Sequence, residues 1–209
     1  MKKFLSLVSI TGLLFLFGCA QKWPTTTGVT TPTLSGVTTL SGATAPTTTP
    51  EAVTTPQKVA DRLPYENKAD GFSIQYPGTR TFQENVYGSA VMFFSPLTGW
   101  DTLKENAGIM KKNLDKDYTL DEYYTITKPE LLKLIPGFTE VSNTPIKVNT
   151  MDAQKLIYTG TQGTTKLKWE QVYLIKNKAV YIITYTATEG TFDQYAQKFD
   201  EMVATLEIK

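Results

Sequence analysis

Hydrophobic and polar residues alternate with a period of two in several segments beyond residue 64, which is the pattern of strands with one buried face. Gly, Pro, Asn and Ser punctuate the chain between these segments and predict the turns that separate them. Seven strands are therefore predicted, over residues 71–77, 89–95, 107–113, 138–148, 153–158, 166–175 and 179–187.

The last two of these segments predict the middle of a sheet. Residues 179–187 carry β-branched and aromatic side chains on both faces, which is typical of a strand covered on both sides. Lys176-Asn177-Lys178 predicts a tight hairpin turn before them, because Asn tolerates a positive φ. Residues 160–163 predict another turn. Residues 166–175 place four apolar side chains on one face, those of Leu167, Trp169, Tyr173 and Ile175.

Two helices are predicted from their first residues. Thr119 with Glu122, and Thr191 with Gln194, each have the spacing of a capping box. Apolar residues recur at helical spacing behind the first, where Pro129 predicts a kink or a restart. Behind the second, one apolar stripe predicts a face buried on the sheet, with Phe199 fully buried: Phe192, Tyr195, Phe199, Met202 and Val203.

The first residues of the chain show a different pattern. Two lysines precede an apolar run over residues 4–17, which is shorter than the roughly 20 residues of a membrane-spanning helix. The run ends in Leu16-Phe17-Gly18-Cys19, which resembles the lipobox of bacterial lipoproteins. The resemblance implies signal cleavage between Gly18 and Cys19 and a lipid thioether on Cys19. Cys19 is the single cysteine, so no intrachain disulfide forms.

Residues 24–56 predict a disordered stalk. Of these 33 residues 14 are Thr and five are Pro, and Glu51 is the single charge. Such a segment cannot bury enough apolar surface to offset the entropy of ordering it. A spacer that lifts a domain from a membrane, and a tolerated low-complexity insert, both fit this composition. The predicted organisation is a signal peptide over 1–18, the lipidated cysteine with its Thr/Pro-rich linker over 19–62, and one domain over 63–209.

Composition within the domain narrows the classes of partner. Residues 65–209 carry 16 Lys and Arg against 18 Asp and Glu, so no basic footprint for nucleic acid is present. Neither sign dominates enough to steer a highly charged partner. These 145 residues suffice for one hydrophobic core. We expect a monomer that does not bind nucleic acid.

Three stretches resemble PsbP-like domains. They are Tyr65-Glu66-Asn67 with residues 71–77, Leu120-Asp121-Glu122-Tyr123, and residues 180–208, which end in Leu206-Glu207-Ile208. The resemblance covers about 145 residues and implies an α+β fold, an α/β/α sandwich with a central antiparallel sheet flanked by helices. The family includes extrinsic subunits of the photosystem II oxygen-evolving complex and bacterial lipoproteins. Membership implies binding or assembly more than catalysis.

The catalytic inventory is small. The chain has no histidine, which removes the commonest general base, the Ser-His and Cys-His nucleophile pairs and the usual zinc ligand. It has no P-loop, GxGxxG or GxSxG motif either, so no cofactor is predicted. Acidic side chains leave a hydrolase based on carboxylates open as an alternative.

Two groups of residues are candidate sites. Residues 95–101 join two predicted strands and contain Leu97 and Trp100, and Trp100 either contacts a partner or folds back over the core. The second group is Asp115 and Asp117 with Asp121 and Glu122, whose oxygen atoms suit calcium. Negative charge near a helix N-terminus explains the same pattern without a metal, and we favour that interpretation.

The sequence thus predicts a lipid-anchored, extracytoplasmic module of the cell envelope. Its expected role is binding or assembly without enzymatic activity. Its partners are a membrane, through Cys19, and an envelope protein or glycan. The alternatives are an envelope hydrolase, a photosystem-associated extrinsic protein and a passive surface spacer.

Overall fold

Ten strands and two helices make up the part of the chain that the computed structural model describes, which is residues 61–97, 99 and 103–209. In chain order they are β1 (Arg62–Asn67), β2 (Phe72–Pro77), β3 (Thr81–Val86), β4 (Ser89–Phe94), β5 (Asn106–Asn113), α1 (Leu120–Leu134), β6 (Thr139–Val148), β7 (Met151–Gln162), β8 (Thr165–Lys176), β9 (Ala179–Thr188), α2 (Phe192–Val203) and β10 (Glu207–Ile208).

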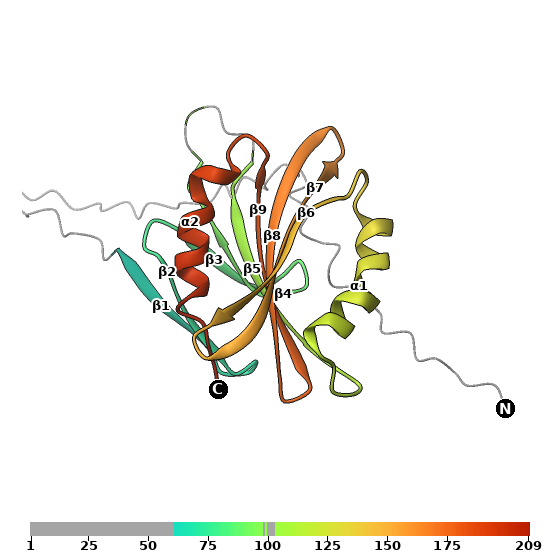
Figure 1. Cartoon of the computed structure of the whole chain (residues 1–209). Coiled ribbons are helices and arrows are strands. Elements are labelled where there is room, and N and C mark those ends of the chain that lie inside the picture. Colours follow the sequence, from blue (N-terminus) through green and yellow to red (C-terminus); the bar gives the residue numbers. More distant parts are fainter. Residues whose placement is uncertain (1–60, 98, 100–102) are drawn as a thin grey trace, which may run out of the picture. The chain divides into compact units, whose positions relative to one another are not determined.

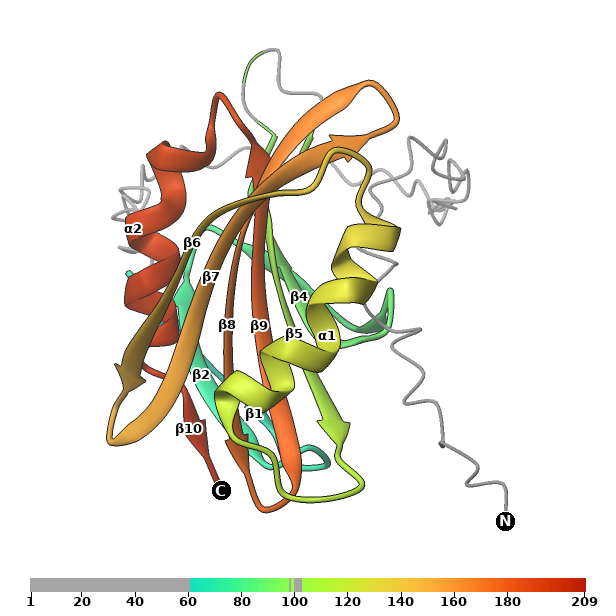
Figure 2. The same ribbon diagram turned by 45° about the vertical axis from the view of Figure 1, so that its right-hand side comes forward.

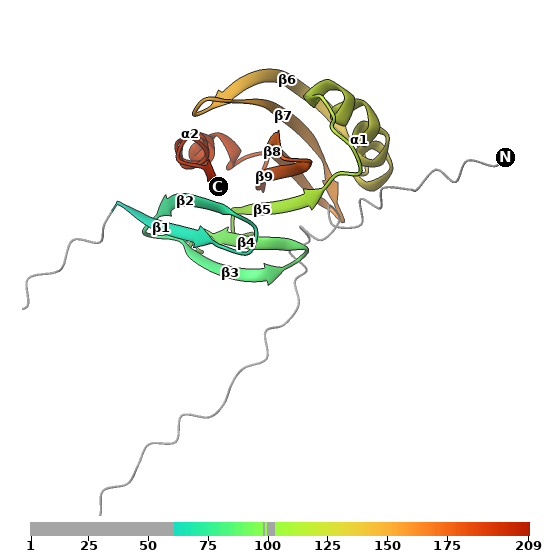
Figure 3. The same ribbon diagram turned by 90° about the horizontal axis from the view of Figure 1, so that it is seen from below.

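These strands form two antiparallel sheets. The large sheet has the order β3-β4-β5-β9-β8-β7-β6, and the small one has the order β1-β2-β10. The helices α1 and α2 lie on opposite faces of the large sheet (Figure 1). Seen from below, the large sheet curves around α2, and β1 and β2 lie between α2 and the β3–β4 hairpin (Figure 3).

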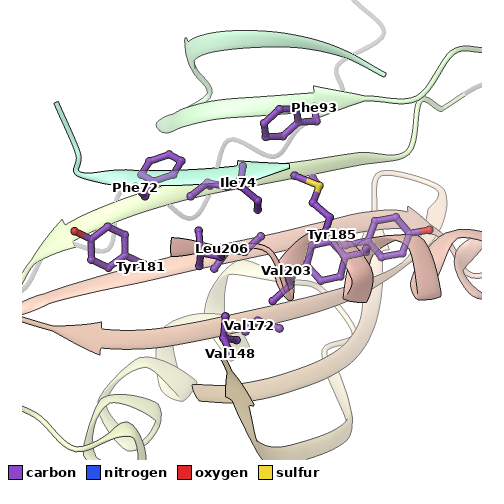
Figure 4. Close-up of a cluster of buried hydrophobic side chains, with 14 of the residues drawn as sticks. Phe72, Ile74, Phe93, Val148, Val172, Tyr181, Tyr185, Val203 and Leu206 are labelled. Carbon is purple, nitrogen blue, oxygen red and sulfur yellow. The ribbon is translucent and has the colours of Figure 1, made fainter. Parts of the chain in front are cut away.

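The main core lies between the two sheets and α2 (Figure 4). Phe72 and Ile74 project from β2 toward Tyr181 and Tyr185 of β9, and the Phe72 and Tyr181 rings are 6.5 Å apart. Every residue of β9 except Thr188 is buried, as the two apolar faces of that strand predict. The opposite face of the sheet packs against α1 in two smaller clusters.

The seven predicted strands are all present, with small changes at their ends. The structure confirms a mostly antiparallel α+β fold with two helices. It adds a second sheet, because the missed strands β1 and β10 pair with β2. The third missed strand, β3, has five exposed residues out of six and therefore lacks the alternation that predicts strands. The predicted stalk and signal peptide lie outside the described residues.

The helix α1 begins at the predicted capping box. The Glu122 amide donates to Thr119 Oγ1 at 3.1 Å, and the Thr119 amide donates to Glu122 Oε2 at 2.9 Å. The helix then runs through Pro129 to Leu134 in one piece, so the predicted restart is wrong. Proline removes one helical hydrogen bond, but Tyr123 and Leu131 on either side of it are both buried, and this packing holds the helix together.

The helix α2 begins without the predicted capping box. Thr191 has a helical backbone, and its side chain makes no hydrogen bond to the first turn. Its hydroxyl lies 2.9 Å from the hydroxyl of Thr188, the last residue of β9. The Thr191 hydroxyl, which the capping box requires, is therefore hydrogen-bonded to Thr188 instead. The stripe prediction is confirmed, since Phe192, Phe199, Met202 and Val203 are buried.

The hairpins follow their turn residues. Lys176 pairs with Ala179, so Asn177 and Lys178 form a two-residue turn, and both have the positive φ of a type I′ turn. The predicted turn at residues 160–163 is misplaced, because Gly160 lies inside β7 and the turn starts at Gly163. Gly160 is needed where β7 passes Ile135: an added Cβ would lie 2.4 Å from Ile135 Cγ2.

Candidate functional site

A wide groove forms where β7 separates from β8. β7 stays paired with β6 down to Met151, but its pairing with β8 ends at Ala153 and Leu174. The β6–β7 hairpin and the β8–β9 hairpin therefore diverge at their ends, and the C-terminal strand β10 lies between them (Figure 2). The groove has a volume of about 960 Å³.

Apolar side chains make up part of the lining of this groove. Leu206 and Ile208 are buried, and Leu120, Met151 and Ile175 are half-buried. The lining includes the start of α1 and the turn of the β6–β7 hairpin. The groove therefore combines elements that are far apart in the sequence: residues 118–121, 145–154, 175–176 and 206–209.

Charged side chains surround the floor. The acidic residues are Asp121, Asp152 and Glu207, and the basic ones are Lys176 and Lys209. Both lysines are engaged: Lys176 Nζ donates to the Ile208 carbonyl at 2.8 Å, and Lys209 pairs with Glu66 outside the groove. Asp152 pairs with Lys147 at 2.7 Å. No such ion pair involves Asp121 or Glu207 within the described residues.

Side chains from both hairpins fix the C-terminal segment in place. Asn149, at the β6–β7 turn, donates from Nδ2 to the Leu206 carbonyl at 2.7 Å. Lys176, at the end of β8, holds the Ile208 carbonyl two residues later. On the other side, the Lys209 amide donates to the Gly71 carbonyl at 2.8 Å. The C-terminal segment that lines the groove is therefore held by hydrogen bonds to three separate parts of the chain.

A buried ion pair lies elsewhere, under α2. Lys155 Nζ is 2.6 Å from Glu170 Oε1, with angles outside hydrogen-bond geometry, and it also pairs with Asp200 of α2. Glu170 is 1 % exposed, and burial raises the pKa of its carboxyl, with the Asp200 carboxyl raising it further. Burial alone lowers the pKa of Lys155, but Asp200 and Glu170 raise it above its usual value. These three charges tie α2 to the sheet.

The first candidate from the sequence, Leu97 with Trp100, belongs to the connection between β4 and β5. Hydrogen bonds join the two ends of this connection. The Ser95 amide donates to the Glu105 carbonyl at 2.9 Å, and Ser95 Oγ donates to the buried Glu105 carboxyl at 2.8 Å. Leu97, just beyond these bonds, is 54 % exposed. Trp100 lies outside the described residues, so its contact role stays a prediction. Gly18 and Cys19 also lie outside them.

The acidic candidates have protein partners. Asp115 accepts a hydrogen bond from the Tyr118 hydroxyl at 2.9 Å, and the nearest cation to Asp117 is Lys178, at 4.0 Å. Glu122 belongs to the α1 capping box. No group of three or more acidic, histidine or cysteine side chains is placed to hold a metal ion in the described part of the chain.

The groove itself was not among the sequence candidates. Its acidic residue Asp121 was assigned to the helix start, and no spacing in the sequence connects residues near 120, 150, 175 and 207. Only the end of the β7–β8 ladder brings them together. The pairing of the strands was predictable in outline, but the residue at which two of them separate was not.

Comparisons with known proteins agree on the fold. The CyanoP protein of Synechocystis sp. PCC 6803, a cyanobacterial PsbP, superimposes with a TM-score of 0.54 at 14% identity, over 75% of this chain and 99% of that one. The PA94 protein of Pseudomonas aeruginosa, of unknown function, gives 0.53 at 18% identity, over 72% and 99%. LpqN of Mycobacterium tuberculosis, involved in cell envelope biogenesis, gives 0.51 at 12% identity, over 71% and 90%. At these identities the similarity shows a shared fold.

No curated protein matches the sequence. None of the described helices is long and apolar enough to cross a membrane. The family model for DcrB matches residues 93–205, more than half of the chain, from the end of β4 to the end of α2. This protein, whose fold is PsbP-like, therefore belongs to the DcrB family.

Proposed function

We propose that this protein is a non-catalytic binding or assembly module of the cell envelope, held outside the cytoplasm by a lipid on Cys19. The groove between the diverging hairpins carries this proposal, because a concave site that brings apolar and polar side chains together is the usual place for a ligand. The fold shared with LpqN, a protein of envelope biogenesis, points to the same compartment.

Binding is favoured over catalysis by the chemistry of the side chains. The chain lacks histidine, and Glu170, whose carboxyl pKa is raised, lies beneath α2 with 1 % of its surface exposed. A carboxyl buried beneath a packed helix offers no approach to a substrate. The groove carries acidic side chains on its rim, in positions suited to holding a partner.

Membrane attachment is tested at Cys19. Acylation with two or more chains gives stable anchoring, so the native protein should sediment with membranes, and its Cys19 peptide should carry lipid by mass spectrometry. We expect Cys19→Ser to move the protein into the soluble fraction. A Cys19→Ser variant that stays with the membranes after carbonate washing would show that the anchor proposal is wrong.

The groove is tested by photocrosslinking in cells. A benzophenone amino acid replaces Thr150, which lines the groove at the β6–β7 turn, or Glu189, which is exposed and lies beyond the opposite end of β9. We expect a discrete crosslinked product from position 150 and none from position 189. Adding Met151→Arg, which places a charge over the groove floor, should abolish the product. Equal products from both positions, or no product from position 150, would contradict a binding role for the groove.

A further inference from the structure

Apart from the two-residue β10, the described sheets end in three strands, and these differ in how their free edges are protected. The strands are β1 of the small sheet and β3 and β6 of the large one. β1 contains Pro64, and β6 contains Pro145. A proline inside a ladder lies where its missing N–H would face outward, so it hinders the addition of a further strand. β3, with the sequence Thr-Phe-Gln-Glu-Asn-Val, has no proline and no lysine.

The free edge of β3 is open. Figure 3 shows β3 as the outermost strand of the large sheet, with β4 on its inner side and no other described element beyond it. Five of its six residues are exposed. The Phe82 ring is 43 % exposed, although it contacts the rings of Tyr65 and Phe93. An exposed apolar ring on an unprotected strand edge suits a contact with another strand.

The hydrogen bonds of the sheet show which backbone groups of β3 are free. The N–H and C=O groups of successive residues in an antiparallel strand point to opposite sides. The Ser95 amide donates to the Glu105 carbonyl at 2.9 Å, so every second residue of β4 before Ser95 points to β5, and the residues between them point to β3. Met92 is one of these, and it pairs with Gln83. The backbone groups of the residues on either side of Gln83 therefore point away from the sheet.

These two residues, Phe82 and Glu84, present an N–H and a C=O each along the edge. The regular strand ends at the next residue, Asn85, whose φ is 54°. The Glu84 carboxylate already accepts a hydrogen bond from the Tyr65 hydroxyl at 2.7 Å. The edge thus offers backbone donors and acceptors and an apolar ring, and its one carboxylate has a partner. A strand of the same character fits it better than a charged one.

A second copy of β3 matches this edge when it runs in the opposite direction. With Gln83 opposite the same residue of the second copy, Phe82 lies opposite Glu84, and each of the two supplies the donor and the acceptor that the other needs. A shift by two residues in one direction would place two Glu84 carboxylates opposite each other, which is destabilising. A shift in the other direction would need the Arg80 amide, which already donates to the Pro77 carbonyl at 2.9 Å.

We propose that two copies of this protein associate through β3, which joins their large sheets into one antiparallel sheet across a two-fold axis at Gln83. The paired stretch is short, so the association is weak, and the monomer expected from the sequence is the form in dilute solution. Dimers form where the proposed lipid anchor concentrates copies in a membrane. β3 contributes no residue to the groove, so this inference is independent of the binding role of the groove.

Disulfide capture tests the two-fold axis on the full-length chain in detergent. The chain carries Cys19→Ser, so that an introduced cysteine is its single thiol. Gln83 and its copy form a non-hydrogen-bonded pair with Cα atoms about 4.5 Å apart, which suits a disulfide, so Gln83→Cys should link under mild oxidation. Thr81→Cys, on the same face of the strand, would lie about 13 Å or more from its copy. We expect linkage at position 83 to be about tenfold or more faster than at position 81, or at Gln197→Cys on the exposed side of α2.

A matched pair of charge substitutions tests the contact without a disulfide. Sedimentation equilibrium over a series of protein concentrations should show a reversible monomer–dimer equilibrium. Gln83→Lys places two like charges opposite each other at the axis and should raise the dissociation constant by about fivefold. Gln197→Lys adds the same charge on the exposed side of α2 and should leave the dissociation constant unchanged.

Four results would overturn the inference. They are linkage at position 81 as fast as at position 83, linkage at position 83 no faster than at position 197, equal weakening by the two Lys variants, and a monomer at every concentration up to about 1 mM. A benzophenone amino acid in place of Gln83 identifies the occupant in cells. A crosslinked product of two copies supports the inference. A product with a different protein alone would overturn it and would assign the edge to a partner's strand.

Discussion

Glu170 is the residue at which charge and burial compete most directly. Its carboxyl is 1 % exposed and lies between Lys155 and Asp200. Removing one partner of a buried pair leaves an uncompensated charge, which typically costs about 3–5 kcal/mol. Asp200 provides Lys155 with a second, partly exposed carboxylate, so Lys155 keeps a partner if Glu170 is neutral. The fold can therefore accommodate both the protonated and the ionised form of the Glu170 carboxyl.

We predict that the free energy of unfolding decreases as the pH rises from 4.5 toward 7. Burial raises the pKa of Glu170 from its ordinary value of 4.5 to about 7, so the native state binds a proton more readily than the unfolded chain in this interval. The contribution is on the order of 1–3 kcal/mol, present at low pH and lost as the carboxyl ionises. Urea unfolding midpoints between pH 4 and pH 8 measure it.

Glu170→Gln should remove most of this slope, whereas Glu189→Gln at an exposed site should leave it unchanged. Below pH 4.5 the slope reverses, because the carboxyls of Glu66, Glu122 and Glu140 have lowered pKa values owing to their hydrogen-bond partners. Their stabilisation is present above pH 4.5 and is lost as the pH falls through their native values. An unchanged slope in Glu170→Gln would mean that another group controls it.

At the scale of elements, the two helix starts show what a local motif can specify. Thr119 and Thr191 stand in the same spacing pattern, yet only Thr119 forms the capping box. The difference lies at Thr188, which ends β9 and whose hydroxyl meets that of Thr191. A capping box is thus predictable from four residues only when the preceding strand leaves the hydroxyl free. The amphipathic stripe behind it was the more reliable signal.

The stripe of α2 leads to a stability prediction. Phe199 is 2 % exposed, and its ring stacks on that of Tyr185 with centroids 5.5 Å apart. Phe199→Ala removes a buried aromatic side chain and should lower the free energy of unfolding by about 3–5 kcal/mol. Chemical denaturation with unchanged far-UV circular dichroism measures the loss. Gln197→Ala on the exposed side of α2 is the control, and a loss below about 1 kcal/mol for Phe199→Ala would mean that the ring is not in the core.

A second prediction concerns the contact between β7 and the end of α1. We expect Gly160→Ala to lower the free energy of unfolding by about 1–3 kcal/mol, because the new Cβ meets Ile135 Cγ2 at 2.4 Å and the Pro136 carbonyl at 3.1 Å. A β-branched methyl cannot easily move aside. Gly137→Ala is a poor control because of its positive φ, so the test pairs Gly160→Ala with Ile135→Leu, which keeps the side-chain volume and lacks Cγ2. The double variant should recover part of the loss.

Strands were predictable here where one face of them is buried. Residues 166–175 and 179–187 alternate or run apolar because both lie at the centre of the sheet. The edge strand β3 exposes nearly all its residues, so it carries no such signal. β10 has two residues and pairs only because the chain returns to β2, which periodicity cannot show. Hydrophobic periodicity therefore predicts strands with a buried face, and it does not reveal strands that are mostly exposed.

For the whole molecule, the groove is a consequence of topology. Its lining comes from the C-terminal segment and from three other parts of the chain, spread over residues 118–209. The sequence offered Leu97 and Trp100 as a candidate contact surface, with folding back over the core as the alternative for Trp100, because an aromatic residue on a loop is a local signal. Leu97 is exposed and its contact role stays a prediction, while a site formed by the end of a strand ladder has no local signal.

The predicted linker ends at a residue that the structure places in a strand. Arg62, assigned to the linker, starts β1 and pairs with Pro77. Its guanidinium lies 2.6 Å from Glu201 Oε2 and donates to the Glu201 carbonyl at 3.0 Å. Strand pairing and α2 therefore both hold Arg62, whereas the preceding basic residue, Lys58, belongs to the predicted linker.

We predict that brief trypsin treatment of the native protein cuts after Lys58 and spares Arg62, because proteases need an extended, accessible chain. Mass spectrometry distinguishes the two products, since one begins at residue 59 and the other at residue 63. Glu201→Gln should increase cutting after Arg62 by freeing its side chain, and Glu189→Gln should not. Rapid cutting of the unaltered protein after Arg62 would place β1 outside the stable domain. Protection of Lys58 would instead mean that the predicted stalk packs against the domain, in conflict with its Thr- and Pro-rich composition.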